Sequence, residues 1–287
     1  MAKWTGQTKG NALGYRIFIV AIKTFGLALA YFILHFVSLY FYLFLKDKRR
    51  DLDNFYQNYV GYSRTKSHRL IRKNFRLLGQ SIIDKIAFLI GAGDEIHYKD
   101  SGEHHLRKLV ADKQGAFLIS AHLGNWDIAG NLLKGFDANV SVVMYQNEQE
   151  SIKALLESQG SVPKFNIIGI GEGFSHLIEI YEAIKRGDLV CMHADRYLEG
   201  VKTVAVPFFG APAKFPIGPF QMIEKLKAPY SFVFAVKESK YGYFFSATLP
   251  VFPTKKAPEI AEDFVLLLEQ KVQENPEQWF NYYNFHE

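Results

Sequence analysis

The chain has 287 residues, and its 34 lysines and arginines outnumber its 29 aspartates and glutamates, giving a net charge of +5. Hydrophobic residues make up 48% of the sequence and charged residues 22%, a balance that excludes general disorder. A mean hydropathy of −0.05 excludes a polytopic membrane protein. The single cysteine, Cys191, excludes an internal disulfide framework. Aromatic residues reach 15%, so their placement along the chain is informative.

An uncharged apolar segment, FGLALAYFILHFVSLYFYLFL, covers residues 25–45. A helix of about 20 residues crosses a hydrocarbon core of roughly 30 Å, so this segment is long enough to span a membrane. It is not a secretory signal, because the apolar run is too long and no small-residue cleavage site follows it. Basic residues on both sides give no orientation. Three arrangements stay open: a span, a helix lying in the membrane interface, and a buried helix over an apolar cavity.

A basic amphipathic helix is predicted from residue 70 to residue 89. Its apolar residues recur at helical spacing and are Leu70, Ile71, Phe75, Leu78, Ile82, Ile86 and Leu89. Its other side carries Arg69, Arg72, Lys73 and Arg76. Such a face is either solvated or, beside an apolar anchor, placed against anionic lipid head groups. The neighbouring apolar segment favours the membrane interpretation.

From residue 104 onward, strand and helix patterns alternate. Strands are predicted at residues 115–121, 139–145, 165–170, 189–193, 230–236 and 243–249, the last antiparallel to its predecessor. Helices are predicted at residues 125–133, 148–158, 174–186, 217–226 and 258–274. This alternation predicts an α/β fold with a mostly parallel open sheet and flanking helices, preceded by the hydrophobic and amphipathic helices. We therefore expect an N-terminal membrane-anchor region, residues 1–62, and an α/β domain, residues 63–287, that includes the amphipathic lead-in.

The sharpest chemical pattern is His122-Leu-Gly-Asn-Trp-Asp127, at the predicted junction of a strand and a helix. Open α/β sheets bind their ligands at this edge. There Asp127 could fix one tautomer of His122 and stabilise its protonated form, while Gly124 would let the backbone approach a substrate. Cys191 lies in a predicted buried strand and no G-x-S-x-G motif occurs. The pair is therefore expected to activate a substrate hydroxyl or amine directly, unless the histidine only caps the helix.

A second cluster, His193-Ala-Asp195-Arg196, also ends a predicted strand. Its strand end is expected on the same edge of the sheet as His122. Arg196 could bind a phosphate or carboxylate bidentately, or form a structural ion pair with Asp195. The histidines and aspartates of the two clusters, Asp127 included, match no dedicated metal-binding spacing.

Two aromatic segments complete the set of candidates. Residues 206–213 read as an apolar loop punctuated by proline and glycine. In this loop Gly210 could present a backbone N–H to a developing oxyanion, and Phe208 and Phe209 could line the site or simply pack. The run at residues 279–285 is dense in aromatics but has no basic cluster beside it. It is therefore expected in a core or interface and not on a nucleic-acid surface.

Four segments taken together, in this order, resemble a known family: ISAHLGNWDIAG, IKRGDLVCMHADR, VPFFGAPAKFPIG and NPEQWFNYYNF. Over residues 70–285 the chain resembles the bacterial lipid A biosynthesis acyltransferases, the late acyltransferases related to lysophospholipid acyltransferases. The resemblance implies an enzyme of lipid A, and hence lipopolysaccharide, biosynthesis on the cytoplasmic face of the inner membrane. Such an enzyme moves a fatty acyl chain from acyl carrier protein, or less often coenzyme A, to a hydroxyl of a lipid acceptor. It needs no metal or organic cofactor.

Mapped onto this chain, the resemblance implies that His122 is the general base and Asp127 its partner. Asn125 and Trp126 complete the first block of the family pattern. His122 would deprotonate the acceptor hydroxyl, whose oxygen attacks the donor thioester, while Asp127 stabilises the imidazolium. Backbone donors near Gly210 would hold the oxyanion.

The chain also departs from the family pattern. Arg196 follows Asp195 where glutamine is more common, Asp127 stands where most members have glutamate, and residues 145–148 replace the usual basic residues. These differences leave the acceptor open among a lipid A precursor, an aminolipid, a phospholipid and an acylated pigment. A lipid hydrolase and a non-catalytic lipid-binding protein are rival functions. The residues expected to contact substrate are Gly124, Asn125, Trp126, Asp195, Arg196, Phe208, Phe209 and Gly210.

Overall fold

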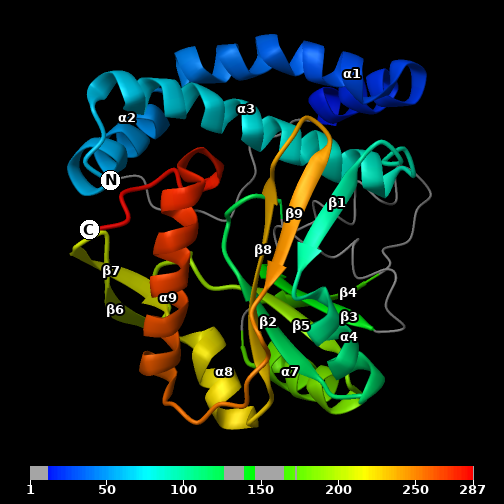
Figure 1. Ribbon diagram of the computed structural model, residues 1–287, viewed down its shortest axis with the longest axis vertical. Helices are drawn as coiled ribbons and strands as arrows, with labels where there is room; N and C mark the ends of the chain where they lie inside the picture. Colours follow the sequence, from blue (N-terminus) through cyan, green and yellow to red (C-terminus); the bar gives the residue numbers. More distant parts are fainter. Residues whose placement is uncertain (1–11, 126–138, 146–164, 172, 287) are drawn as a thin grey trace.

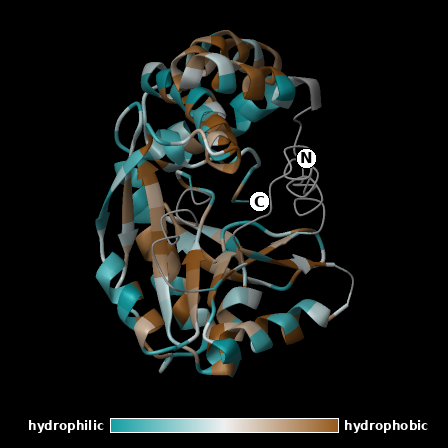
Figure 2. Cartoon of the chain, turned by 90° about the vertical axis from the view of Figure 1, so that its right-hand side faces the viewer, coloured by the Kyte–Doolittle hydropathy of each residue, from teal (hydrophilic) through white to brown (hydrophobic). Residues whose placement is uncertain are grey.

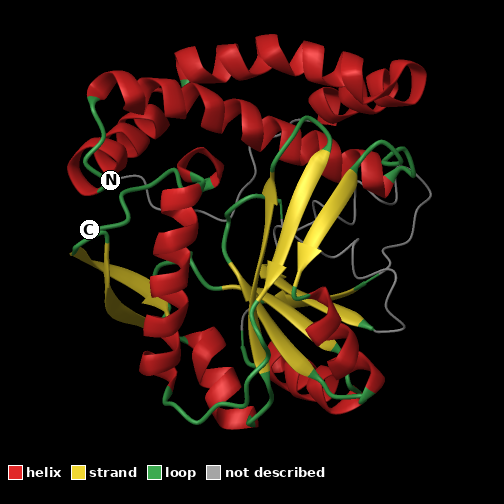
Figure 3. Cartoon of the chain, in the orientation of Figure 1, coloured by secondary structure: helices red, strands yellow, loops and turns green. Residues whose placement is uncertain are grey.

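The computed structural model describes residues 12–125, 139–145, 165–171 and 173–286. In Figure 1, long helices cross the top of the molecule and a twisted sheet stands beneath them. Figure 3 shows the strands in yellow, with the helices in red arranged around them. This arrangement confirms the predicted α/β class with its preceding helices.

A seven-stranded sheet forms the centre of the fold. Its order is β1 (His97–Ser101), β9 (Gly242–Ala247), β8 (Tyr230–Lys237), β2 (Ala116–Ser120), β5 (Leu189–His193), β3 (Val140–Tyr145) and β4 (Asn166–Ile170). All neighbouring strands are parallel except β8 and β9, which are antiparallel. The six predicted strands agree with the structure to within two residues at each end, and β5 agrees at both ends. The exposed, polar strand β1 was not predicted, because it lacks the apolar pattern of a buried strand.

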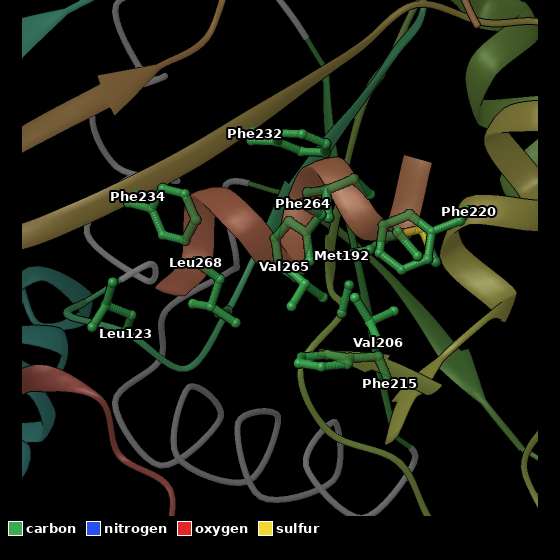
Figure 4. Packing of buried hydrophobic residues seen from close by; sticks show 14 of the residues in the cluster. Leu123, Met192, Val206, Phe215, Phe220, Phe232, Phe234, Phe264, Val265 and Leu268 are labelled. Atoms are coloured by element: carbon green, nitrogen blue, oxygen red, sulfur yellow. The ribbon is translucent and has the colours of Figure 1, made fainter. Parts of the chain in front are cut away.

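Helices cover the sheet, and their buried side chains form the hydrophobic core together with those of the strands. They are α4 (Glu103–Ala111), α7 (Ser175–Arg186), α8 (Gly218–Leu226) and α9 (Ala257–Glu274), and the last three confirm predicted helices. Apart from Asn125, the predicted helices at 125–133 and 148–158 lie outside the described residues. Figure 4 shows Phe264 of α9 among core side chains; its ring centroid lies 5.4 Å from that of Phe232 on β8 and 5.6 Å from that of Phe220 on α8. Because both faces are covered, strand β2 is buried along its whole length.

The N-terminal part consists of α1 (Ala12–Phe44), α2 (Lys46–Asn54), the π-helix η1 (Phe55–Tyr59) and α3 (Arg64–Leu89). Helix α1 breaks at Gly26, whose φ is +76°, and it packs along α3. Ile71 and Phe75 of α3 are buried while Arg72 is exposed, which confirms the amphipathic prediction.

The prediction of a loop at residues 206–213 is wrong. Those residues belong to an antiparallel hairpin of β6 (Thr203–Phe208) and β7 (Ala211–Pro216). Its turn, Phe209-Gly210, has φ of +51° and +76°, the positive values that a two-residue type I′ hairpin turn requires. The prolines favoured a loop prediction, because proline has no backbone N–H to donate to the hydrogen-bond ladder of a central strand. A two-stranded sheet has only edge strands, where prolines are tolerated.

Candidate active site

His122 and Asp195 are brought together by the register of two parallel strands. In the ladder between β2 and β5, Ser120 pairs with His193 at the strand ends. Two residues further on, His122 meets Asp195, although 73 residues separate them in the sequence. The His122 Nδ1 atom lies 2.7 Å from Oδ1 of Asp195, and the main-chain N–H of His122 donates to Oδ2 at 2.9 Å. The two predicted strand ends therefore do share one edge of the sheet.

The charge of Asp195 determines the tautomer of His122. Burial raises the pKa of Asp195, but its attraction to His122, the hydrogen bond from that ring and the Arg196 guanidinium together hold the pKa below its ordinary value. An ionised carboxylate only accepts hydrogen bonds, so Nδ1 of His122 donates to it. The neutral imidazole then carries its lone pair on Nε2, where a proton can be taken up. The side chain of His122 is 19% exposed, against 1% for Asp195, so solvent reaches the histidine but not its carboxylate partner.

A second histidine packs against the first. The ring centroid of His193 lies 4.2 Å from that of His122, with 54° between the ring planes. Burial, and then the nearby His122, lower the pKa of His193 well below its ordinary value. A neutral ring in this position restricts the rotation of His122 without adding a second positive charge.

The loop after β2 is held by the backbone of β8 and by α3. A Cβ on Gly124, whose φ is +72°, would lie 2.0 Å from the Ala235 carbonyl oxygen of β8, so only glycine fits. The close approach at Gly124 is therefore to β8, whereas the sequence led us to expect one to substrate. Asn125 is buried; its main-chain N–H donates to the Ala235 carbonyl at 2.7 Å. Its Nδ2 donates to the Ser81 carbonyl at 3.1 Å and to the Tyr243 hydroxyl at 3.3 Å.

The C-terminal aromatic run lies against the same loop. The Phe280 N–H donates to the His122 carbonyl, and the Gly124 N–H donates to the Gln278 carbonyl, each at 2.9 Å. Between these two bonds, Trp279 forms an antiparallel bridge with the loop. A run that was expected only to pack therefore borders the histidine and its carboxylate.

The predicted residues of the hairpin have different surroundings. Phe208 is buried, with its ring centroid 5.3 Å from that of Trp279, so it packs against the C-terminal run that borders the site. The main-chain N–H of Phe209 donates to Glu269 of α9. Gly210 is exposed at the tip of the turn, next to that contact.

Other predicted residues divide into those with described contacts and those without. The Arg196 guanidinium donates to the Phe280 carbonyl, which attaches the second block of the sequence pattern to the C-terminal run. Asp127 and Trp126 lie outside the described residues. Burial raises the pKa of the Cys191 thiol to about 12, which disfavours a thiolate nucleophile. Within the described ranges, no group of three or more His, Cys, Asp or Glu side chains could hold a metal ion.

Comparisons with known proteins identify the family. The family model for bacterial lipid A biosynthesis acyltransferases matches residues 10–284 of this chain. The chain belongs to this family. The phosphatidylinositol mannoside acyltransferases of two Mycobacterium tuberculosis strains are 30% identical to it over 122 residues. That match covers 42% of this chain and 38% of each relative, so it spans well under half the length of these curated proteins.

A solved structure is similar to this acyltransferase family member along nearly its whole length. The 1-acyl-sn-glycerophosphate acyltransferase PlsC from Thermotoga maritima aligns over 93% of this chain and 97% of its own chain, with a TM-score of 0.42 and 14% sequence identity.

Two features of the site in this family member could not be read from its motifs. Asp195 is expected from the sequence to contact substrate, and the structure adds that its carboxylate holds His122, a contact set by the register of β2 against β5. Trp279 contacts Asp195 from 84 residues away. Its aromatic run was visible in the sequence, but no periodicity indicates which carboxylate an indole reaches.

Proposed function

We propose that this chain is a membrane-associated acyltransferase that moves a fatty acyl chain from a thioester donor to a hydroxyl of a lipid acceptor. One observation carries the proposal: His122, at the open edge of the sheet, donates from Nδ1 to the buried carboxylate of Asp195 at 2.7 Å. A histidine oriented by a carboxylate is a suitable general base for a hydroxyl nucleophile. Membership of an acyltransferase family supports the same chemistry.

In the proposed reaction, Nε2 of His122 removes the acceptor hydroxyl proton as the oxygen attacks the thioester carbonyl carbon. Asp195 stabilises the imidazolium that forms. The tetrahedral oxyanion then collapses, the carbon–sulfur bond breaks, and the leaving thiolate takes the proton back from His122. The products are an ester and a free thiol, and the histidine returns to its starting state. The proposed steps use only these side chains and the two substrates, and they require no metal or organic cofactor.

The test is His122→Ala in purified protein, with acyl transfer followed from a labelled thioester. We expect activity to fall by a factor on the order of 10²–10⁴, the usual contribution of a general base. His104→Ala is the matched control, because His104 is an exposed histidine of α4. Full activity in His122→Ala would contradict the mechanism.

The acceptor that we favour is a lipid A precursor, and more broadly a lipid that carries sugar hydroxyls. The family name supports the first, and the phosphatidylinositol mannoside acyltransferases support the wider class.

We propose acyl carrier protein as the donor, with acyl-coenzyme A as the alternative. Lipidomics of a deletion strain should reveal one lipid species short by one acyl chain. Acyl transfer by the purified enzyme, measured with each donor in turn, identifies which thioester it uses.

The same assays separate the rival functions. A lipid hydrolase would release free fatty acid without an acylated acceptor, because water would replace the acceptor hydroxyl. A non-catalytic lipid-binding protein would show no turnover, and its lipid binding would survive His122→Ala. Mass spectrometry of the products distinguishes transfer, hydrolysis and no turnover, and a lipid-binding measurement on His122→Ala tests the last case.

For membrane attachment we propose that α1 lies in the interface, on the cytoplasmic face of the inner membrane. Residues 14–44 are long and apolar enough to cross a membrane, with a mean hydropathy of 2.3 in their most apolar window, yet 39% of that window is buried. The buried side packs on α3, which lies directly beneath α1 in Figure 1. Exposed apolar residues on α1 include Phe25, Phe32, Phe36, Leu39, Tyr40, Leu43 and Phe44. The helices at the top of Figure 2 accordingly carry much hydrophobic (brown) ribbon.

This geometry favours the interface, because a spanning α1 would have to leave α3 and expose the buried faces of both helices. The break at Gly26 also divides α1 into pieces, the longer of which can lie flat with one face in the acyl region. Phe32→Asp and Phe36→Asp, at side chains 61% and 59% exposed, should weaken flotation with anionic vesicles. Leu266→Asp, at an exposed leucine of α9, is the control. Unchanged flotation of the two α1 variants would contradict this placement.

A further inference from the structure

In the described part of the chain, three hydrogen-bond donors contact the carboxylate of Asp195, and one of them comes from the C-terminal run. Oδ1 accepts from His122 Nδ1, and Oδ2 accepts from the His122 main-chain N–H at 2.9 Å. Oδ2 also accepts from the indole Nε1–H of Trp279 at 3.3 Å. A buried carboxylate needs such donors to replace water, and the indole supplies the donor that does not belong to His122.

The Trp279 ring has little freedom to move. It is almost fully buried and packs in edge contacts with Phe55 at 4.9 Å, Phe208 at 5.3 Å and Phe285 at 5.2 Å between ring centroids. A donor fixed in this way points at one place, so the orientation of the carboxylate follows the position of the ring.

The segment that carries Trp279 is attached to the N-terminal helices. The buried Asn74 side chain of α3 donates to the Trp279 carbonyl at 2.9 Å and accepts from the Tyr282 hydroxyl at 2.6 Å. The Tyr56 hydroxyl of η1 donates to the Pro276 carbonyl at 2.8 Å. On its other side, the segment that carries Trp279 forms the two backbone hydrogen bonds to the His122 loop. The segment therefore joins the N-terminal helices to the active-site loop.

We propose that Trp279 is a positioning residue that sets the orientation and basicity of Asp195, and through Asp195 those of His122. Residues 276–283 are then part of the active site, although they contact substrate in no step of the mechanism. The inference rests on the proposed role of His122 as general base.

The chemistry predicts a particular effect of removing the indole donor. Without it, more negative charge stays on Asp195, so its bond to His122 strengthens and the imidazolium is favoured. Among the described residues, the charged and titratable groups around Asp195 and His122 include His193 on β5, the adjacent Arg196, the Tyr283 hydroxyl of the C-terminal run and, acting on His193, Lys85 of α3. None of these is altered by a substitution at Trp279, so a change in the titration of His122 reports the lost donor.

The experiment uses Trp279→Phe in the full-length protein, which keeps an aromatic ring and removes the N–H. We expect kcat to fall about ten-fold, because the carboxylate without its fixed donor no longer holds the His122 ring in one orientation, and this outweighs the gain in basicity. KM should stay within about two-fold because substrate contacts are unchanged. The acid limb of the pH–rate profile should move to higher pH. Phe264→Leu is the control, because it removes a buried ring of α9 without touching Asp195.

A second measurement does not depend on activity. Histidine-ring ¹⁵N NMR follows the titration of His122, whose resonance is assigned by its absence in His122→Gln. A shift of the His122 midpoint to higher pH in Trp279→Phe supports the inference even if acyl transfer is not the reaction. If the parent protein transfers no acyl chain, the proposed function fails separately. An unshifted midpoint in a folded Trp279→Phe overturns the inference, as does a kcat loss no larger than that of Phe264→Leu.

If Trp279→Phe is not recovered folded, Tyr283→Phe tests the same segment. The Tyr283 hydroxyl donates to the main-chain carbonyl of Asp195 at 3.1 Å, and its loss should lower kcat about three-fold at constant KM. Parent-like kcat in Tyr283→Phe would overturn the role of the C-terminal run.

Discussion

Asp195 and Asp84 are both fully buried carboxylates, and the hydrogen-bond network of each reaches the loop that follows β2. Asp84, on α3, is 2.6 Å from Nζ of Lys237 and also accepts from the hydroxyls of Tyr31 and Tyr243. Asp195 is paired with His122 and the indole of Trp279. Each carboxylate thus has a cationic or protonatable group as a hydrogen-bond partner, with neutral donors beside it.

The partners differ in what they can do. The Lys237 side chain is only 4% exposed. Burial lowers the pKa of Lys237, and Asp84 opposes that shift. The pair is closed to solvent, and its hydrogen bonds join α1, α3 and β8. His122 reaches the surface and can exchange a proton at Nε2. The comparison teaches that burial of the carboxylate is common to both sites, and that access to its partner separates the structural pair from the pair proposed to be catalytic.

The largest expected effect follows from removing the charge of Asp195. Asp195→Asn keeps the shape but no longer requires the proton on Nδ1 of His122, so acyl transfer should fall by a factor on the order of 10²–10⁴. Asp188→Asn is the control, since Asp188 is a buried carboxylate beside the opposite end of β5. Asp127→Asn, measured in parallel, tests the partner predicted from the sequence. A larger loss in Asp127→Asn than in Asp195→Asn would assign the orienting role to Asp127.

Breaking the sealed pair should act on stability. Lys237→Met leaves Asp84 buried without its cation, and we expect the free energy of unfolding to fall by about 3–5 kcal/mol. Urea unfolding in detergent micelles measures this, with Lys240→Met, at an exposed lysine, as the control. Adding Asp84→Asn should recover most of the loss, because no unpaired charge then remains. A loss below about 1 kcal/mol would show that the pair behaves like a surface ion pair.

An intermediate effect is expected at the loop that both networks reach. Gly124→Ala places a Cβ against the Ala235 carbonyl and adds about 1–2 kcal/mol of left-handed backbone strain, so both stability and kcat should decrease. Gly210→Ala is the matched control: its φ of +76° is similar, but nothing lies within 4 Å of the added Cβ. Circular dichroism melting and the acyl-transfer rate should separate the two variants. Equal losses would mean that strain alone, and not contact with β8, matters.

The smallest effect is expected for Tyr31→Phe on α1. It removes one of the hydroxyls that donate to Asp84 and should cost about 1 kcal/mol of stability, with the charge pair still intact. If kcat also falls, the attachment of α1 influences the catalytic loop. The same urea series, read together with the acyl-transfer rate, provides the measurement.

Much of the fold followed from local patterns. Continuous apolar runs predicted β2 and β5, because a strand buried on both faces must be apolar throughout. The spacing of apolar residues predicted α9 and the amphipathic α3. The hairpin at residues 203–216 was missed, since its prolines are read as loop signals unless the sheet is known to have only edge strands.

The site was predictable only in part. The strand end identified His122 as the candidate base and placed Asp195 on the same edge, but helical spacing favoured Asp127, the nearest carboxylate in sequence, as the partner. Asp127 lies outside the described residues, so its role stays a prediction. The contact of Asp195 with His122 depends on the register of β2 against β5, which arises from the packing of the whole sheet. The contact of Trp279 with Asp195 depends on where the chain returns after α9, and no local preference encodes that.

The sequence by itself determined the class of fold, the apolar N-terminal helix, the family and the histidine at the sheet edge, because each is recorded in composition, periodicity or a short motif. Only the tertiary structure decided that α1 packs on α3, that Asp195 holds His122, and that the aromatic C-terminal run supports the pair. These are contacts between residues far apart in the chain. Burial of a carboxylate and the donors that must accompany it are properties of the assembled core.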